Sequence, residues 1–387
     1  MRNVLRWLGR ILLALVLAAV IVGVWKREQL VRVWTVITLF EEDRIVQNFT
    51  SMDDAFLNAP LSRGDGPVSP LPKGAVMVLP EGTDAWLESR WATSLLVLKD
   101  GEIRHEAYFR NTEASDMRIS WSIAKSYLSV LMGVLVADGT IPSLDAPVTD
   151  YVPSLVDSGY DGASIRNVLQ MTSGVIFNED YFDFQSDIQR MGRTVALGGR
   201  LDDFTASFPD RFADPGARWQ YTSIDTHVIG MVIRGASGRS VKELMAEKVL
   251  APLGLEQDGF YITDGVGTAF VLGGLNFVTR DYGRFGLMVA QNGNYQGNQV
   301  VPAEWIAEST AASAPTEPGK YRYGYQWWIP DGAEAGEFLG RGVYGQYLYI
   351  DQQRGVVIVL TSADRKFRET GRDAENVERL RQIAQAL

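Results

Sequence analysis

A serine and a lysine lie three residues apart at Ser122 and Lys125, where an apolar segment begins. Residues at this spacing share one face of a helix, so the lysine amine can reach the serine oxygen. A serine needs a base to become a nucleophile, and a desolvated lysine can act as one. The chain has only two histidines and no cysteine, so other nucleophile–base pairs are scarce. The spacing therefore indicates a serine nucleophile with a lysine base.

The spacing alone is a weak signal, because Ser-x-x-Lys occurs by chance about once in a chain of this length. The alternative is that Ser122 caps a helix and Lys125 lies in solvent. The segment is apolar on nearly all sides, which predicts a buried helix. A lysine in a buried helix needs a partner or a lowered pKa. The apolar residues are Trp121, Ala124, Tyr127, Leu128, Leu131, Met132 and Leu135.

Two further stretches carry groups that could serve the same chemistry. Tyr221 and Ser223 follow a Pro-Gly turn and precede an apolar helix, where they could offer a phenolate and a hydrogen-bond donor. Taken alone, this pair reads more readily as a core aromatic and a helix cap. Gly340, Arg341 and Gly342 come before a predicted strand, 346–351, so a backbone N–H there could approach a ligand closely. A simple turn is an equally good interpretation of these glycines.

Other chemistries find little support. The stretch 340–345 matches a dinucleotide fingerprint only formally, because a strand and not a helix follows it. We expect His105 to be a surface residue of a strand, and no carboxylate is evidently placed to orient His227. No Gly-x-Ser-x-Gly motif occurs, and no His/carboxylate cluster has metal spacing. We therefore expect neither a metal nor a cofactor.

The three motifs in this order resemble the serine β-lactamase and penicillin-recognising superfamily. The resemblance covers roughly residues 75 to 385 and is nearest to the class C-like branch, which includes carboxylesterases and 6-aminohexanoate-dimer hydrolases. Further stretches that resemble this group are 165–174, 273–276 and 323–328. The resemblance implies an α+β fold of the β-lactamase/transpeptidase type and hydrolysis through an acyl-enzyme.

The resemblance also implies roles for particular residues. Ser122 is the nucleophile, Lys125 its base and Tyr221 the group that moves a proton to the leaving group. Ser223 matches the serine or asparagine two positions further on. The implied oxyanion hole is formed by the backbone N–H groups of Ser122 and Val343. Tyr181 is similar to an extra tyrosine of the 6-aminohexanoate-dimer group.

One departure from the family pattern concerns the third motif. β-Lactamases and D,D-peptidases have Lys-Thr-Gly where this chain has Gly340-Arg341-Gly342. The lysine and hydroxyl that hold a β-lactam carboxylate are therefore missing. Arg341 could replace the charge or point into solvent. The departure favours ester or amide hydrolysis over lactam cleavage.

The order of predicted elements indicates how these residues are positioned. Strands at about 91–99 and 102–109 come first, a helical section follows at about 140–320, and strands at 325–329, 346–351 and 355–361 precede a helix at 373–387. This order predicts one antiparallel sheet built from both chain ends, flanked by helices and interrupted by a mostly helical insert. The catalytic domain is expected to span residues 76–387.

The N-terminus predicts a membrane segment. Arg2, Arg6 and Arg10 precede an uninterrupted apolar run, 11–25, that shows no small-x-small cleavage site. We expect residues 1–26 to be an uncleaved anchor, with a cleaved signal as the alternative, and residues 27–75 to be a juxtamembrane connector. The arginines favour a cytoplasmic N-terminus and a catalytic domain on the extracytoplasmic, periplasmic side.

Composition limits the kinds of partner that we expect the protein to bind. The chain has 387 residues, 46% of them apolar, and a net charge of -10, which argues against nucleic-acid binding. The sequence thus predicts a membrane-anchored serine hydrolase of a small-molecule or peptide-like ester or amide. The alternative is a penicillin-binding-protein-like sensor that acylates or binds without efficient turnover.

Overall fold

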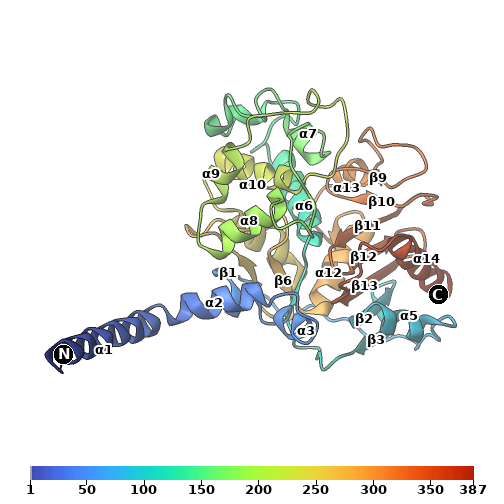
Figure 1. Cartoon of the computed structure of the whole chain (residues 1–387). Coiled ribbons are helices and arrows are strands. Elements are labelled where there is room, and N and C mark those ends of the chain that lie inside the picture. Colours follow the sequence, from blue (N-terminus) through green and yellow to red (C-terminus); the bar gives the residue numbers. More distant parts are fainter. Residues whose placement is uncertain (1) are drawn as a thin grey trace.

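A seven-stranded antiparallel sheet forms one half of the molecule in the computed structural model, which describes residues 2–387 (Figure 1). Its order is β3-β2-β13-β12-β11-β10-β9, and β2 pairs with β13 with Val97 opposite Ile358. The expected sheet from both chain ends is therefore confirmed. The strands are β2 (Ala92–Lys99), β3 (Glu102–Tyr108), β9 (Arg322–Tyr323), β10 (Trp328–Ile329), β11 (Glu337–Gly342), β12 (Gln346–Asp351) and β13 (Val356–Ser362).

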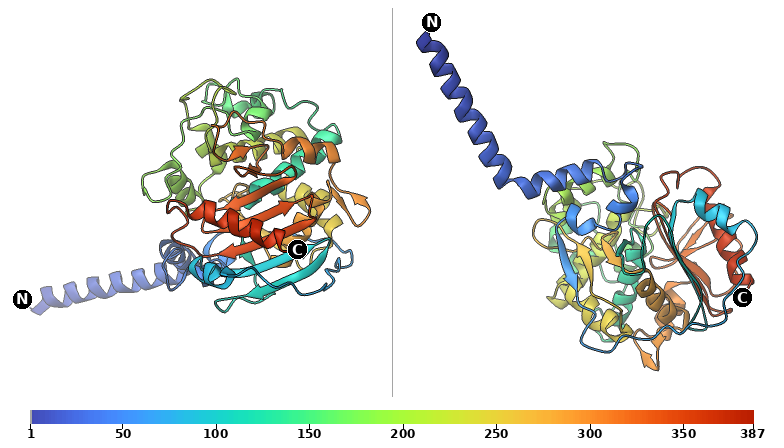
Figure 2. Two further views of the ribbon diagram at one scale, coloured as in Figure 1. Left: turned by 90° about the vertical axis from the view of Figure 1, so that its right-hand side faces the viewer. Right: turned by 90° about the horizontal axis from the view of Figure 1, so that it is seen from below.

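Helices cover both faces of this sheet, which explains why its central strand, β12, is buried along its whole length. Helices α5 (Thr83–Ser89) and α14 (Arg372–Gln385) lie on the outer face, where Trp86 and Leu380 join one apolar cluster (Figure 2). On the inner face lie α6 (Ile123–Ala137) and α12 (Thr279–Ala290), and α12 contacts both β2 and β13. The expected terminal helix and the expected helix after Ser122 are both present.

The insert between the two parts of the sheet is mainly helical, as predicted, and adds a small sheet that the sequence did not suggest. That sheet has the order β1-β5-β6-β4. Its strands are β1 (Asn58–Leu61), β4 (Arg118–Ile119), β5 (Gly259–Ile262) and β6 (Leu275–Phe277), and a hairpin pairs β7 (Asn294–Tyr295) with β8 (Asn298–Gln299). The remaining helices of the insert are α7 (Ile165–Leu169), α8 (Asp187–Ala196), α9 (Leu201–Ala206), α10 (Ser223–Ser237), α11 (Val241–Met245) and α13 (Ala303–Ser309).

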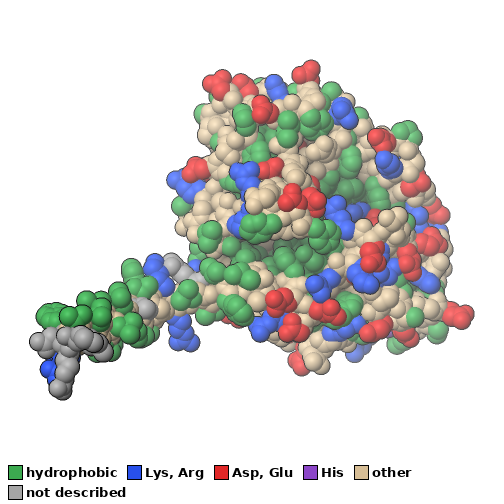
Figure 3. All heavy atoms as spheres, viewed as in Figure 1, with side chains coloured by type: hydrophobic (Ala, Val, Ile, Leu, Met, Phe, Trp, Pro, Cys, Tyr) green, Lys and Arg blue, Asp and Glu red, His purple; other side chains and the backbone are tan. Residues whose placement is uncertain are grey.

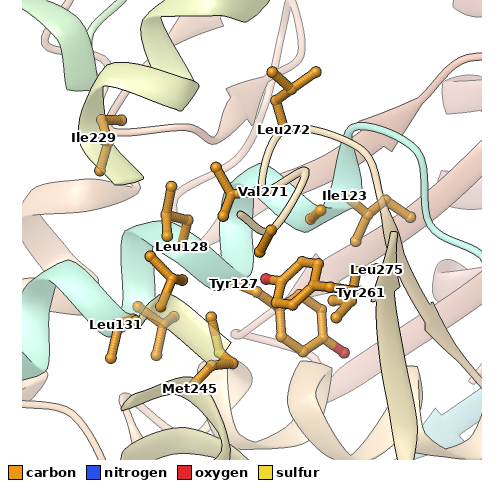
Figure 4. Packing of buried hydrophobic residues seen from close by; sticks show 14 of the residues in the cluster. Ile123, Tyr127, Leu128, Leu131, Ile229, Met245, Tyr261, Val271, Leu272 and Leu275 are labelled. Carbon is orange, nitrogen blue, oxygen red and sulfur yellow. The ribbon is translucent and has the colours of Figure 1, made fainter. Parts of the chain in front are cut away.

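Helix α6 runs through the centre of the molecule and is buried along nearly its whole length. Figure 4 shows Leu128 and Leu131 of α6 beside Ile229 of α10 and Met245 of α11, with Tyr127 beside Tyr261 of β5. This segment is apolar on all sides because it is buried on all sides, as the sequence predicted. A helix held from every side keeps its first turn, which carries Ser122 and Lys125, in a fixed place.

The N-terminal region begins with α1 (Arg2–Trp25), which projects from the body of the molecule (Figure 1). Its stretch Arg6–Trp25 is long and apolar enough to cross a membrane, as an anchor or a signal sequence would be. Only Lys26 separates it from α2 (Arg27–Ile37). The short helices α3 (Ile45–Asn48) and α4 (Met52–Ala55) then bring buried side chains into the main core, and β1 pairs with β5. The second half of the expected connector is thus packed structure.

One local expectation differs from the structure. Gly340–Gly342 end strand β11 and precede a turn, whereas the sequence suggested the entrance of the next strand. The prediction missed β11 because its sequence, EFLGRG, is too rich in glycine to resemble a strand.

Candidate active site

Ser122 and Lys125 meet at the first turn of α6. Lys125 Nζ lies 2.9 Å from Ser122 Oγ and donates a hydrogen bond to the Leu272 carbonyl at 2.7 Å. Ser122 occupies the N-cap position, yet its side chain makes no capping hydrogen bond. Lys125 is only 1% exposed. The alternative of a capping serine and a solvated lysine is therefore wrong.

Burial decides the protonation state of Lys125. Desolvation lowers its pKa from 10.5 to about 7, against the opposing attraction of Glu179. An amine with this pKa is neutral in a large fraction of molecules near pH 7. The Leu272 carbonyl accepts one N–H, which directs the amine toward Ser122. Lys125 thus has the charge state and the position of a general base.

Tyr221 lies on the other side of Ser122, before α10. Burial and the charge of Glu179 raise its pKa, against hydrogen bonds to Ser122 and Ser223 and the charge of Arg341. Its ring stacks on Trp328 with 5.1 Å between centroids, and Lys125 Nζ lies 5.4 Å from its ring centroid. Tyr221 is therefore a neutral phenol that can donate a proton, and this pKa argues against a phenolate.

Glu179 holds the polar side chains around this centre. Its carboxylate accepts hydrogen bonds from the Ser223 backbone N–H at 2.9 Å, from the Ser223 hydroxyl and from the Tyr181 hydroxyl at 2.7 Å. It also acts electrostatically on both Lys125 and Tyr221. The sequence prediction missed Glu179, although it stands only two residues before Tyr181. No spacing rule indicates that a loop carboxylate reaches a residue 44 positions away.

Ser122 and Val343 line the same cavities, and within residues 2–387 the backbone N–H group of each has no protein acceptor. Each is adjacent to an aromatic residue with positive φ, Trp121 at 43° and Tyr344 at 60°. Such values are unusual for bulky residues and are a mark of functional sites. Gly342 is required here, since a Cβ would meet the Ser120 carbonyl oxygen at 2.6 Å.

Arg341 does not point freely into solvent. Its guanidinium pairs with Asp373 at 2.8 Å and lies over the Trp328 ring, 4.8 Å from the centroid. The side chain nevertheless lines the cavity that contains Ser122. A substrate carboxylate at this place would have to compete with Asp373.

Two cavities meet at Ser122. The polar arm, as we call it, has a volume of about 290 Å³, and all but two of the predicted site residues line it. The exceptions are Lys125, which contacts Ser122 Oγ, and Ser223, which lines the second cavity. That cavity, the apolar arm, measures about 390 Å³. Both arms are lined by Ser122, Tyr181 and Val343.

The two histidines lie outside both arms. His227 is buried and its Nε2 lies 2.8 Å from an Asp202 carboxylate oxygen, so the expectation that no carboxylate orients it is wrong. Asp202 also pairs with Arg234, and His227 and Arg234 line a separate small cavity. His105 is half-buried on β3, so the expectation of a surface position holds only in part.

Comparison with known proteins assigns the family. A family model described as beta-lactamase matches residues 83–382. The chain belongs to the beta-lactamase family. This agrees with the sequence resemblance.

The relatives of this beta-lactamase-family protein include amide and ester hydrolases. It is 31% identical over 291 residues to the 6-aminohexanoate-dimer hydrolase of Paenarthrobacter ureafaciens, covering 72% of this chain and 74% of that one. It is 32% identical over 154 residues to the esterase EstB of Burkholderia gladioli, covering 36% and 37%.

Solved structures show the same fold. A candidate 6-aminohexanoate-dimer hydrolase from Bacillus anthracis aligns with a TM-score of 0.79 at 22% identity, covering 90% of this chain and 95% of that one. A family VIII carboxylesterase aligns with a TM-score of 0.59 at 16% identity, covering 80% and 99%. Together with the family match, the named relatives place this protein among serine hydrolases of the amidase or esterase type.

Proposed function

We propose that this protein hydrolyses an ester or amide through an acyl-enzyme on Ser122. The observation that carries the proposal is the 2.9 Å contact between Ser122 Oγ and the buried Lys125 Nζ. Neutral Lys125 takes the proton of Ser122 as Oγ attacks the substrate carbonyl. The N–H groups of Ser122 and Val343 bind the oxyanion that forms.

Collapse of the tetrahedral intermediate breaks the bond to the leaving group. Tyr221 donates its proton to the departing oxygen or nitrogen and takes a proton from the protonated Lys125. Lys125 thereby becomes a neutral base again. A water molecule then attacks the acyl-enzyme and gives a proton to the same base. Lys125 returns this proton to Ser122 Oγ as the bond to the acyl carbon breaks, and the acid product leaves. Glu179 positions Ser223 and Tyr181 around these groups without touching the reacting atoms.

A fluorophosphonate probe with mass-spectrometric mapping tests the nucleophile. We expect labelling of Ser122 in the full-length protein and none in Ser122→Ala. Labelling that persists in Ser122→Ala, or that maps to another serine, would overturn the proposal. A product burst without steady turnover across esters and amides would indicate the alternative, a sensor that acylates and stops.

The proposal includes a place in the cell. The stretch Arg6–Trp25 would anchor the protein in a membrane, with residues 76–387 as the catalytic domain on the extracytoplasmic side. Protease added outside spheroplasts should then digest the catalytic domain. Digestion only after lysis would contradict this orientation.

A further inference from the structure

The apolar arm has the walls of a site for a hydrocarbon chain. Apart from Ser122, Ser223, Tyr181, Tyr344, Gln189 and Arg193, its lining is made of apolar side chains and glycine. Its volume of about 390 Å³ lies within the range of small-molecule sites. Figure 3 shows a hollow in this face lined by hydrophobic side chains, which continue along α2. Such a cavity gains free energy from each methylene group that it removes from water.

The two arms divide the substrate at the reacting bond. Ser122 lines both arms, whereas Tyr221 and Arg341 line only the polar arm. Because Tyr221 is the proposed acid, the leaving group must lie on its side of Ser122. The acyl part then extends in the other direction, into the apolar arm. Glu179, Arg341 and Asp373 offer charged partners for a polar leaving group.

The N-terminal segment forms one wall of the apolar arm. Val36 and Ile37 of α2 line it together with Leu39 and Phe40, which follow directly. Ile37 is 69% exposed although it lines the cavity, and Phe184, also a lining residue, is 66% exposed. The rim of the arm therefore presents apolar side chains to its surroundings. Only Lys26 separates α2 from the apolar helix α1.

We propose that the substrate is a long-chain acyl ester or amide whose hydrocarbon chain enters the apolar arm from the lipid bilayer along α2. This proposal rests on the proposed function and names the substrate class of the same site. Ser122 then cleaves the bond between the chain and a polar leaving group. The products are a fatty acid and the alcohol or amine that occupied the polar arm.

The chain-length dependence of hydrolysis tests the acyl class. The full-length protein in phosphatidylcholine vesicles is assayed with p-nitrophenyl acetate, butyrate, hexanoate, octanoate and decanoate. We expect kcat/KM to rise by about three- to fourfold per methylene until the arm is full. A flat profile with acetate hydrolysed would overturn the acyl proposal and leave the hydrolase intact. A protein that cleaves none of these esters and is not acylated at Ser122 would instead refute the proposed function.

A matched pair of variants tests where the hydrocarbon chain of the substrate binds. Ile37→Ser should lower kcat/KM for p-nitrophenyl decanoate by about three- to tenfold and lower that for p-nitrophenyl acetate much less. Val156→Ser also removes an exposed apolar side chain, 51% exposed, but outside the arm, so it should change neither value. An equal loss for both esters in Ile37→Ser would contradict the assignment of the arm.

Binding of the acyl chain and its entry from the bilayer are measured in separate experiments. A diazirine fatty acid on Ser122→Ala should label residues 36–40 or 184–195 whatever the turnover, and labelling elsewhere would overturn the site. p-Nitrophenyl decanoate dissolved in the vesicles that hold the protein should be cleaved faster than p-nitrophenyl decanoate supplied on albumin. Equal rates would refute entry from the bilayer and leave the acyl preference standing.

Discussion

Glu179 fixes Ser223 by two hydrogen bonds, one from the backbone N–H at 2.9 Å and one from the hydroxyl. The same carboxylate holds the Tyr181 hydroxyl and is the charge that opposes the lowered pKa of Lys125. One loop side chain thus sets both the position of the residues around Ser122 and the electrostatic potential at the base.

Glu179→Gln should move the acid limb of the pH–activity profile to lower pH. The carboxylate raises the pKa of Lys125, so its removal lowers that pKa below about 7 and leaves the amine neutral in more acidic solution. The measurement is kcat/KM between pH 5 and 9, with Asp183→Asn as the control from the same loop. An acid limb that stays in place or moves upward would show that Glu179 does not act on the base.

Lys125→Met should abolish turnover and stabilise the fold near neutral pH. The pKa of Lys125 is 10.5 in its ordinary state and about 7 in the fold, so the unfolded chain binds more protons between these values. The stability of the native protein therefore rises with pH through this window, by about 1.4 kcal/mol per unit. The advantage of the variant is largest below pH 7 and disappears above about 10.5.

Urea midpoints at several pH values measure this difference. Lys320→Met, at a side chain that is 71% exposed, is the control and should show no such trend. A Lys125→Met protein with a constant difference from pH 6 to 10 would mean that Lys125 keeps its ordinary pKa in the fold.

Tyr221→Phe should slow the cleavage of amides and alkyl esters by about 10² to 10⁴-fold, the usual contribution of a general acid. p-Nitrophenyl esters should lose much less, because nitrophenolate leaves without a proton. Tyr323→Phe is the matched control, since Tyr323 lies beside Tyr221 and its hydroxyl has no partner within residues 2–387. Equal losses for good and poor leaving groups would assign Tyr221 a role in packing alone.

Gly342→Ala should lower kcat by about 10² to 10³-fold, the effect of losing one oxyanion donor. The new Cβ would meet the Ser120 carbonyl oxygen at 2.6 Å and Trp121 Cβ at 3.0 Å, which displaces the turn that carries the Val343 N–H. Gly66→Ala, where nothing lies within 4 Å, is the control. Stopped-flow acylation rates and circular dichroism separate a lost donor from a misfolded chain. An acylation rate unchanged from the wild type would exclude this turn from the site.

Local spacing made part of the site predictable. Ser122 and Lys125 meet because helix geometry joins residues three apart, and the apolar sequence around them required burial of the amine. Tyr221 and the glycines of 340–342 needed the family resemblance, since each motif alone also suits an ordinary turn or core position.

Contacts between distant segments could not be predicted in this way. Glu179 and Ser223 are 44 residues apart, and the Asp202 partner of His227 is 25 residues away. Such pairs depend on how loops pack in three dimensions, which neither periodicity nor spacing records. The sheet was easier to predict from the sequence, because each apolar strand, such as β13, can be recognised without knowing its neighbours.

The aromatic packing of the N-terminal segment changes where the protein can be divided. The family match begins at residue 83, yet Phe40 stacks on Tyr344 with 4.8 Å between ring centroids, and Phe49 contacts Trp121. Arg118, which is only 1% exposed, donates to the Val46 carbonyl and to Thr50. A chain begun at the family boundary would lose the contacts that support Trp121 and Tyr344, the two residues beside the proposed oxyanion donors. The segment that the family model matches is therefore shorter than the segment that packs as one folded unit.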